Sequence, residues 1–501
     1  PMDYAVQALP QFKRHRMPGN LYMANSIYVN HLSSTLLPLS DKERKRKVKQ
    51  VRDDLHNLLQ DQTSRGGWSW MPGGKETSLH ITAAILERLA CCTSLMSGDY
   101  YKRYWKTAVA ALDEEVVRRY QQSTQPLGHS VTQPLATLFA RSFYLDKFPL
   151  AECDSITREA YDYYYRRCRV QTAQELSLMS QGQLALLMLR MGDTAEAVAM
   201  ANRIKEMAHT DEQQGMYWVG NVAGYGWYQR PVETASLLVD VFADVLKDWE
   251  SVNRIQQWIL SAKQGTTWKT DMATASAVAA LVRQPADTVR SLPATLTVNG
   301  KPYEEFKQSH AGEDAGAPKE PTTLNFQLEN PSPYPAWGAV FSSRELPLDS
   351  IRYDGTAISL RKTLSLVAAD GSLRLLGPDD VLHVGDRVRV HIDIYCERDM
   401  DNMVLVDQRA AAFEPVSTAS GWQWCCGVGS ADNDGLRYYV DVRDESHNCY
   451  IDRLNEGRYY VEYDLWVRHA GTFECGIGVL RSVYAPEFRA NTPSVKLRIV
   501  D

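Results

Sequence analysis

The first 290 residues show the hydrophobic spacing of amphipathic helices, one after another along the chain. Apolar side chains recur at positions i, i+3, i+4 and i+7, as in Leu184, Leu187, Met188 and Met191. That spacing places all four on one face of a helix. The same spacing returns over residues 238–245, and no alternating pattern typical of a strand interrupts the region. The pattern predicts a unit built of helices.

A weak internal repeat runs through this helical region. Loops containing Gly and Trp, at residues 67–70, 226–227 and 265–268, each precede a helix that carries a Thr-Ala pair. A Trp side chain buries a large apolar area and can fill the end of a helix pair, while small Ala residues permit close packing. Repeated helical hairpins stack as a solenoid or close into a ring. We predict an α/α toroid with the Gly/Trp loops buried along one rim.

The pattern changes to that of β-strands near Leu292. Residues 295–301 (TLTVNGK) are typical of a strand that enters an Asn-Gly turn. Over residues 388–394 and 459–467, apolar side chains alternate largely with polar ones, which is typical of a strand with one buried face. Several such strands joined by short turns predict an antiparallel β-sandwich.

The predicted fold class is therefore multidomain α plus β. We expect an α/α toroid over residues 1–290, a small β unit over residues 291–375 and a C-terminal antiparallel β-sandwich over residues 376–501. The length agrees with this division, because 501 residues are too many for one hydrophobic core.

The charge of the chain argues against one class of partner. The formal net charge is −6, whereas a protein that binds nucleic acid presents a positive surface. The basic run at residues 42–49 (KERKRKVK) is typical of a solvated helix face.

No run of about eighteen apolar residues occurs, so we expect no membrane-spanning helix. The chain starts at Pro1 without the features of a signal peptide, and we expect it to be a fragment of a longer protein.

The nine cysteines argue against a disulfide scaffold or a closed metal site. Their number is odd, no Cys-x-x-Cys pair occurs, and the adjacent pairs at residues 91–92 and 425–426 do not suit a closed zinc site. Buried free thiols are the expected state. We expect no metal-binding and no cofactor-binding residues.

Enzymes built on helical toroids carry characteristic catalytic motifs, and the sequence can be searched for them. The Asp-x-Asp-Asp run of terpene cyclases is absent. The strongest enzymatic alternative is a polysaccharide lyase, in which Tyr or His acts as base and Asn or Arg neutralises the substrate carboxylate. Asn221, Tyr225, Tyr228 and Arg230 lie together on one loop and suit those roles. We expect a repeat loop with buried aromatic residues there, no catalytic residues, and a protein that is not an enzyme.

Motifs in the helical region resemble those of one known family, the bacterial alpha-2-macroglobulins. Residues 4–10 (YAVQALP) resemble the segment that precedes the reactive thioester in that family. Residues 224–234 (GYGWYQRPVET) resemble its "W…P-[IV]-E-T" turn and helix, and residues 258–270 resemble its "W-L-…-K-Q-…-W-x-T" signature. By this resemblance the helical region corresponds to the family's thioester domain.

The β region resembles the same family, in the same order. The resemblance identifies residues 291–375 as a linker with a CUB-like portion and residues 376–501 as the last macroglobulin-like, receptor-binding-like domain. The matching segments are residues 336–340 (AWGAV), 384–390 (VGDRVRV), 407–415 (DQRAAAFEP), 471–473 (GTF) and 484–488 (YAPEF).

The chain departs from the family at the reactive motif, Cys-[Gly/Ala]-Glu-Gln, in which the Cys thiol forms an ester with the Gln carbonyl. Where that motif is expected, residues 17–25 read MPGNLYMAN, with neither Cys nor Gln. Only residues 168–171 (CRVQ) place Cys and Gln three apart, far from the expected position and without the Glu. We expect this second segment to be coincidental.

The resemblance implies the scaffold of a protease inhibitor without its thioester chemistry. We expect non-covalent trapping of proteases or envelope defence, or else a purely structural or partner-binding role in the envelope. The implied partners are proteases or other envelope proteins, together with the upstream part of the parent chain. The resemblance also implies a periplasmic location, or attachment to the cell envelope through a lipid.

Overall fold

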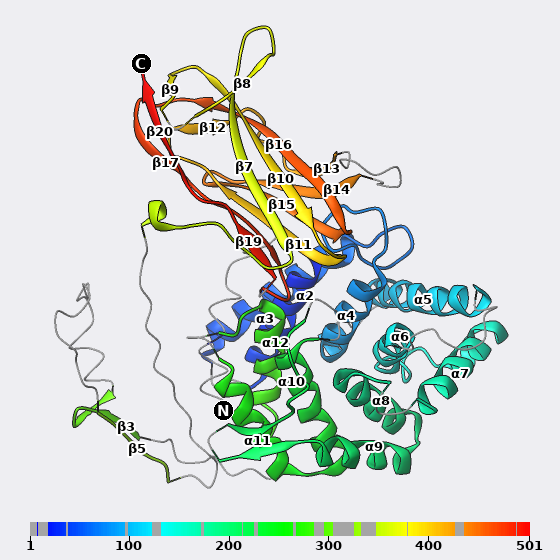
Figure 1. Cartoon of the computed structure of the whole chain (residues 1–501). Coiled ribbons are helices and arrows are strands. Elements are labelled where there is room, and N and C mark those ends of the chain that lie inside the picture. The colour runs from blue at the N-terminus through cyan, green and yellow to red at the C-terminus, as the bar shows by residue number, and fades with distance from the viewer. Residues whose placement is uncertain are drawn as a thin grey trace.

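The computed structural model combines a ring of helices with a β-sandwich seated on it (Figure 1). It describes Ala8 and residues 19–36, 39–95, 99–122, 132–171, 175–212, 214–224, 229–263, 267–284, 295–303, 325–331, 347–377, 379–425, 435–486 and 488–501.

The helical unit consists of paired helices. Its α-helices are α2 (Asn20–Leu36), α3 (Asp41–Gln60), α4 (Leu79–Leu89), α5 (Asp99–Gln122), α6 (Thr132–Ser142), α7 (Ser155–Arg169), α8 (Leu178–Met191), α9 (Thr194–Glu206), α10 (Pro231–Val241), α11 (Trp249–Ser261) and α12 (Asp271–Leu281). Shorter helical turns are η2 (Ala90–Leu95), η3 (Leu150–Glu152), η4 (Phe242–Leu246) and η5 (Leu348–Ser350), the last of which lies outside the unit.

The even-numbered helices close into an inner ring. Each of α2, α4, α6, α8, α10 and α12 packs on the next, and α12 packs back on α2. Odd-numbered helices lie outside, where α3 packs on α2 and α9 on α8. This closed order confirms the predicted α/α toroid.

The Gly/Trp repeat has a common hydrogen-bond pattern. The indole Nε1 of Trp68 donates to the carbonyl of Leu58, near the end of α3, at 2.7 Å, and that of Trp268 donates to Ile259, near the end of α11, at 2.8 Å. Each Trp backbone N–H donates to a Thr hydroxyl of the following helix, Thr82 at 2.9 Å and Thr274 at 3.2 Å. Both Trp side chains are buried, as predicted.

A third Trp makes the same indole contact without having been predicted to do so. Trp218 Nε1 donates to Ile204 in the last turn of α9 at 2.8 Å. It follows the hairpin of β1 (His209–Asp211) and β2 (Gly215–Tyr217), which corrects the expectation that no strand interrupts the helices. Gly215 has φ 84°, and a Cβ there would meet the carbonyl of Arg254 in α11. The predicted loop residue Trp227 lies outside the described residues.

The sandwich is built from two main sheets and a smaller one. One sheet has the order β12 (Phe413–Pro415), β16 (Gly457–Val467), β10 (Arg387–Cys396), β7 (Ile358–Val367) and β8 (Leu373–Leu375). The facing sheet has the order β13 (Gly421–Cys425), β14 (Leu436–Val442), β15 (Ser446–Leu454), β11 (Met400–Gln408), β18 (Gly478–Ser482), β19 (Arg489–Asn491) and β6 (Asp354–Gly355). The smaller sheet has the order β17 (Gly471–Cys475), β20 (Val495–Val500) and β9 (Val381–His383).

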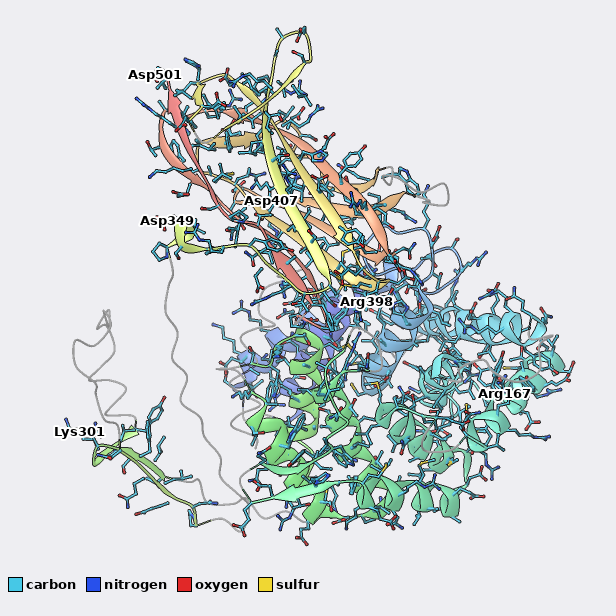
Figure 2. The ribbon with its side chains drawn as sticks, in the orientation of Figure 1. Arg167, Lys301, Asp349, Arg398, Asp407 and Asp501 are labelled. Carbon is cyan, nitrogen blue, oxygen red and sulfur yellow. The ribbon has the colours of Figure 1, made fainter. Side chains whose placement is uncertain are left out.

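The apolar side chains that alternate with polar ones in β10 form the buried face of that strand, as predicted. Val388, Val390, Ile392 and Ile394 of β10 are buried in the core between the sheets. The pairing of β20 with β9 is parallel, which departs from a wholly antiparallel sandwich. Asp407, on β11, lies inside the sandwich although it is charged (Figure 2).

The sandwich begins earlier in the chain than the expected boundary at residue 376. Strand β7 pairs along its whole length with β10, from Ile358 opposite Cys396 to Val367 opposite Arg387. Strand β7 therefore belongs to the same sheet as β10, although the expected boundary separates them. The division of the chain into three domains stays a prediction.

Within residues 291–375, the described strands ahead of the sandwich form one small sheet. Its order is β4 (Lys301–Pro302), β3 (Thr295–Val298) and β5 (Phe326–Glu329), with the predicted Asn-Gly turn between β3 and β4. Of the helices in the described residues, none is both long enough and apolar enough to span a membrane.

Candidate functional site

Residues 19–25, the described part of the segment where a thioester motif was expected, lie at the rim of the toroid that faces the sandwich. Helix α2 starts there at Asn20, directly after Gly19. The start of α12 reaches the same place, where Asn25 Nδ2 donates to Asp271 Oδ2 at 3.0 Å. Figure 1 shows the lower end of the sandwich resting on the helical unit beside α2. We call the contact between this rim and the sandwich the junction.

Asn20 is a buried polar residue held by the loop that contains the first Gly/Trp repeat. Its backbone N–H donates to the carbonyl of Trp70 at 2.8 Å. Its side-chain Nδ2 donates to Asp61 Oδ2 at 2.6 Å and to the carbonyl of Ser69 at 3.0 Å. Its Oδ1 accepts no hydrogen bond from the described residues. Asn20 therefore joins the start of α2 to the loop by three hydrogen bonds, with no thiol at its position.

Trp70 carries the contact from this loop to the sandwich. Its indole Nε1 donates to the Tyr484 hydroxyl at 3.2 Å. Its ring meets the edge of the Tyr450 ring at a centroid distance of 6.0 Å. All three side chains are buried in one hydrophobic cluster that spans the helical unit and the sandwich. An aromatic cluster of this kind adds to the area buried between two units, so the toroid and the sandwich are packed together here.

Charged side chains are buried beside this aromatic cluster. The guanidinium of Arg230, at the start of α10, lies over the ring of Tyr484 at 4.8 Å. Burial lowers the pKa of Arg230 to about 10 and raises the pKa of both Glu233 and Asp271. Because Arg230 and the two carboxyl groups act on one another, each offsets part of the cost of burying the others.

The edge of the junction is polar. Trp422 Nε1, on β13, donates to the carbonyl of Pro72 at 3.3 Å. Arg437 stacks over Trp422 at 4.3 Å and faces Glu76 of the helical unit at 3.6 Å. Burial lowers the pKa of His80, in the first turn of α4, to about 4, with the charges of Arg230 and Arg453 acting in the same direction. His80 is therefore neutral near pH 7.

The Cys-x-x-Gln segment at residues 168–171 is poorly placed for thioester chemistry. Cys168 is buried in the core of the helical unit, and burial raises the pKa of its thiol to about 12. Val170, two residues later, is largely exposed. A buried thiol of raised pKa is a weak nucleophile, which agrees with the expectation that residues 168–171 match the motif by coincidence.

Of the residues considered for a lyase, the structure describes Asn221 and Arg230, and these two do not form an open site. Arg230 is buried under Tyr484, and Asn221 Nδ2 donates to the carbonyl of Pro231 at 3.0 Å, which holds the loop against α10. Tyr225 and Tyr228 lie outside the described residues.

The sequence indicated the two ends of the junction but not their contact. Trp70 belongs to the predicted repeat and Tyr484 to a family motif, yet they lie 414 residues apart in the chain. The sequence did not indicate that Arg230 and Asp271 are buried, because a charged residue is expected at the surface. Arg230 was considered only as a lyase residue, and the burial of both side chains is seen only in the structure.

Comparisons with known proteins agree with this architecture. Residues 358–487 match the family model described as Bacterial Alpha-2-macroglobulin MG10 domain, whereas no curated protein matches the chain. The solved structure of Salmonella alpha-2-macroglobulin reacted with methylamine is similar, with 14% sequence identity, a TM-score of 0.63, and coverage of 100% of this chain and 31% of that chain.

Native alpha-2-macroglobulin from Escherichia coli has the same fold in two structures. One spans the residues from domain MG7 to the C-terminus, with 12% identity, a TM-score of 0.63, and coverage of 99% of this chain and 75% of that chain. The other is a cryo-EM reconstruction with 12% identity, a TM-score of 0.63, and coverage of 99% and 30%.

The resemblance drawn from the sequence motifs is confirmed. The chain spans less than a third of the Salmonella chain that it matches. At these identities the likeness to solved structures shows the fold, while the match to the domain model identifies the sandwich. Residues 358–487 match the MG10 domain of bacterial alpha-2-macroglobulin, and the whole length of the chain has the fold of the C-terminal region of the Escherichia coli protein.

Proposed function

We propose that the chain is the C-terminal part of a bacterial protease inhibitor that traps its target without forming a covalent bond. The match to the MG10 domain of bacterial alpha-2-macroglobulin supports an inhibitor rather than an enzyme. The observation that carries the non-covalent mechanism is the buried Asn20, with neither Cys nor Gln over residues 17–25. Without a Cys thiol and the acyl group of a Gln side chain in this segment, there is no activated thioester to capture an attacking nucleophile.

The junction has a role in this proposal that is separate from chemistry. Its Trp70–Tyr484 hydrogen bond, its aromatic cluster and its buried Arg230 join the toroid to the MG10 domain. Separating the two units would expose that apolar cluster and those buried charges to water, which costs free energy. The two units would therefore move together when a protease cleaves a bait segment elsewhere in the parent protein.

The proposed partners and location follow from the same family. The partners are proteases that reach the cell envelope, together with the remainder of the parent chain. The location is the periplasm or the envelope, with attachment through a lipid upstream of the chain. A structural role in the envelope without inhibition is the alternative, and the test below distinguishes it.

A comparison of small and large substrates tests the trap. The full-length parent is incubated with a general protease, and cleavage of a short peptide is compared with cleavage of a large protein. A protease held in a cage still admits peptides, so we expect protection of the large substrate alone. Serum albumin in place of the parent provides the control. Equal cleavage of both substrates would contradict trapping and leave the structural role.

A further inference from the structure

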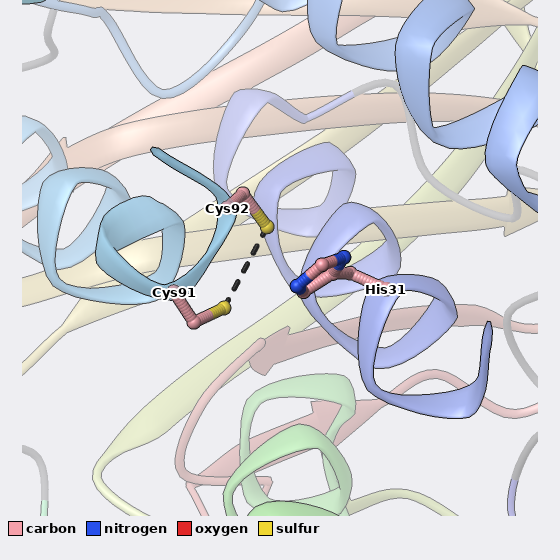
Figure 3. Close-up of side chains that lie close together, drawn as sticks. All are labelled: His31, Cys91 and Cys92. Carbon is pink, nitrogen blue, oxygen red and sulfur yellow. Dashed lines mark hydrogen bonds between the residues drawn. The ribbon is translucent and has the colours of Figure 1, made fainter. Parts of the chain in front are cut away.

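Three side chains that can bind a metal converge on the helical unit, away from the junction contacts. They are His31 on α2 and the adjacent residues Cys91 and Cys92 in η2. One ligand atom from each lies within 4.8 Å of the ligand atoms of the other two. Figure 3 shows the His31 ring and the two thiols facing a common space between α2 and the end of α4.

The spacing of the two sulfur atoms suits one ion between them. The Cys91 and Cys92 Sγ atoms lie 3.6 Å apart. Two thiolates bound to one tetrahedral Zn²⁺ at about 2.3 Å lie about 3.8 Å apart. A disulfide requires about 2.05 Å, and both residues are free cysteines. The observed separation is that of a thiol–thiol hydrogen bond (Figure 3), and it is close to the separation of a metal-bound pair and far from that of a disulfide.

The His31 ring is oriented so that it can bind the same ion as the two thiols. A hydrogen bond to the backbone of Cys91 holds the ring beside the two thiols. Neutral imidazole is the form that ligates metals, and a backbone hydrogen bond to one ring nitrogen commonly orients the other toward the ion. The ring and the thiols come from elements that already pack together, since η2 contacts both α2 and α4.

We propose that His31, Cys91 and Cys92 form a Zn²⁺ site with two thiolates, one imidazole and an open fourth position for water. Each thiol releases its proton on binding, so the two thiolates balance the charge of the ion. Thiolate and imidazole are the ligands that favour zinc over Mg²⁺ or Ca²⁺. The bound ion would join α2, which carries Asn20, to the end of α4.

This inference changes one expectation from the sequence. The sequence predicts no metal-binding residues, whereas the proposed site has three protein ligands and an open fourth position. The third ligand could not be seen in the sequence because His31 lies far from the cysteine pair and on another helix.

Metal titration of the reduced chain tests the site. Cys425 and Cys426 are first replaced by Ser, so that the other adjacent pair cannot bind the probe. Zn²⁺ affinity and stoichiometry are measured by calorimetry, and Co²⁺ serves as a spectroscopic probe of thiolate ligation. We expect one ion per chain, a thiolate-to-cobalt charge-transfer band, and a higher melting temperature in Zn²⁺, because a ligand that binds the native state stabilises it.

Two variants and a matched control decide the assignment. His31→Ala and Cys91→Ser, both at positions that are not fully buried, should each weaken Zn²⁺ binding by more than about 10-fold. Cys153→Ser, which removes a thiol elsewhere in the helical unit, should leave the affinity unchanged. Circular dichroism checks that each variant is folded. Failure of the reduced chain to bind Zn²⁺, or unchanged affinity in His31→Ala, would overturn the proposal.

Discussion

Replacing Trp268 by Ala is expected to lower the free energy of unfolding of the helical unit by about 3–5 kcal/mol. The Trp268 side chain is 2% exposed and belongs to the main core of the helical unit. Truncation leaves a cavity and removes the indole hydrogen bond to Ile259. It also deprives the loop between α11 and α12 of the side chain that fixes it. Urea unfolding followed by the helical circular dichroism signal measures the effect.

The matched control is another Trp that makes little buried contact. Trp424, on β13, is 60% exposed, so Trp424→Ala should change the free energy of unfolding by at most about 0.5 kcal/mol. An unchanged unfolding midpoint for Trp268→Ala would contradict the account of the Gly/Trp loops. It would instead point to a Trp that faces a ligand.

Replacing Lys362 by Met is expected to destabilise the sandwich by about 3–5 kcal/mol at neutral pH. Lys362 Nζ lies 2.7 Å from Asp407 Oδ1, and the two side chains are 2% and 0% exposed. Lys362 also donates to the carbonyl of Gly476 at 3.1 Å, and Tyr463 donates its hydroxyl proton to Asp407. Without the ammonium group, the Asp407 carboxylate remains buried with no opposite charge beside it.

A double variant separates the loss of the pair from the loss of packing. Lys362→Met combined with Asp407→Leu removes both charges, and should recover much of the stability, because an apolar pair of similar volume avoids the cost of a buried charge. The exposed pair of Arg468 and Glu414 on the same sandwich is the control, and Arg468→Met should cost at most about 1 kcal/mol. Thermal unfolding of the sandwich measures all three. If Lys362→Met and Arg468→Met lowered the stability equally, the claim that burial makes the Lys362–Asp407 pair important would be contradicted.

Much of the fold could be predicted because local patterns carry it. The helical spacing around Leu184 and the alternation around Val390 report which face of an element is buried, and both residues are buried in the structure. The Gly/Trp repeat also predicted Trp68 and Trp268 as buried side chains. Ring closure was predicted from the repeat as a whole, since each hairpin needs a neighbour to cover its apolar face.

The contacts between distant segments could not be predicted in the same way. The approach of Trp70 to Tyr484 depends on how the sandwich sits on the toroid, which no local pattern records. The burial of Asp407 could not be predicted from the sequence for a related reason, because its partner Lys362 lies on β7 in the facing sheet. Strand β7 was expected in the β unit over residues 291–375, and its pairing with β10 is not recorded in any local pattern. The convergence of His31 with Cys91 likewise depends on tertiary packing.

The absence of covalent capture is the central claim, and methylamine tests it most directly. The 501-residue chain is incubated with methylamine, and its mass and free-thiol content are compared before and after. Salmonella alpha-2-macroglobulin, whose structure was solved after reaction with methylamine, is the matched positive control. The account predicts an unchanged mass and an unchanged number of free thiols. Stoichiometric gain of one methylamine with release of one thiol, abolished by Cys168→Ser or another single Cys replacement, would contradict it.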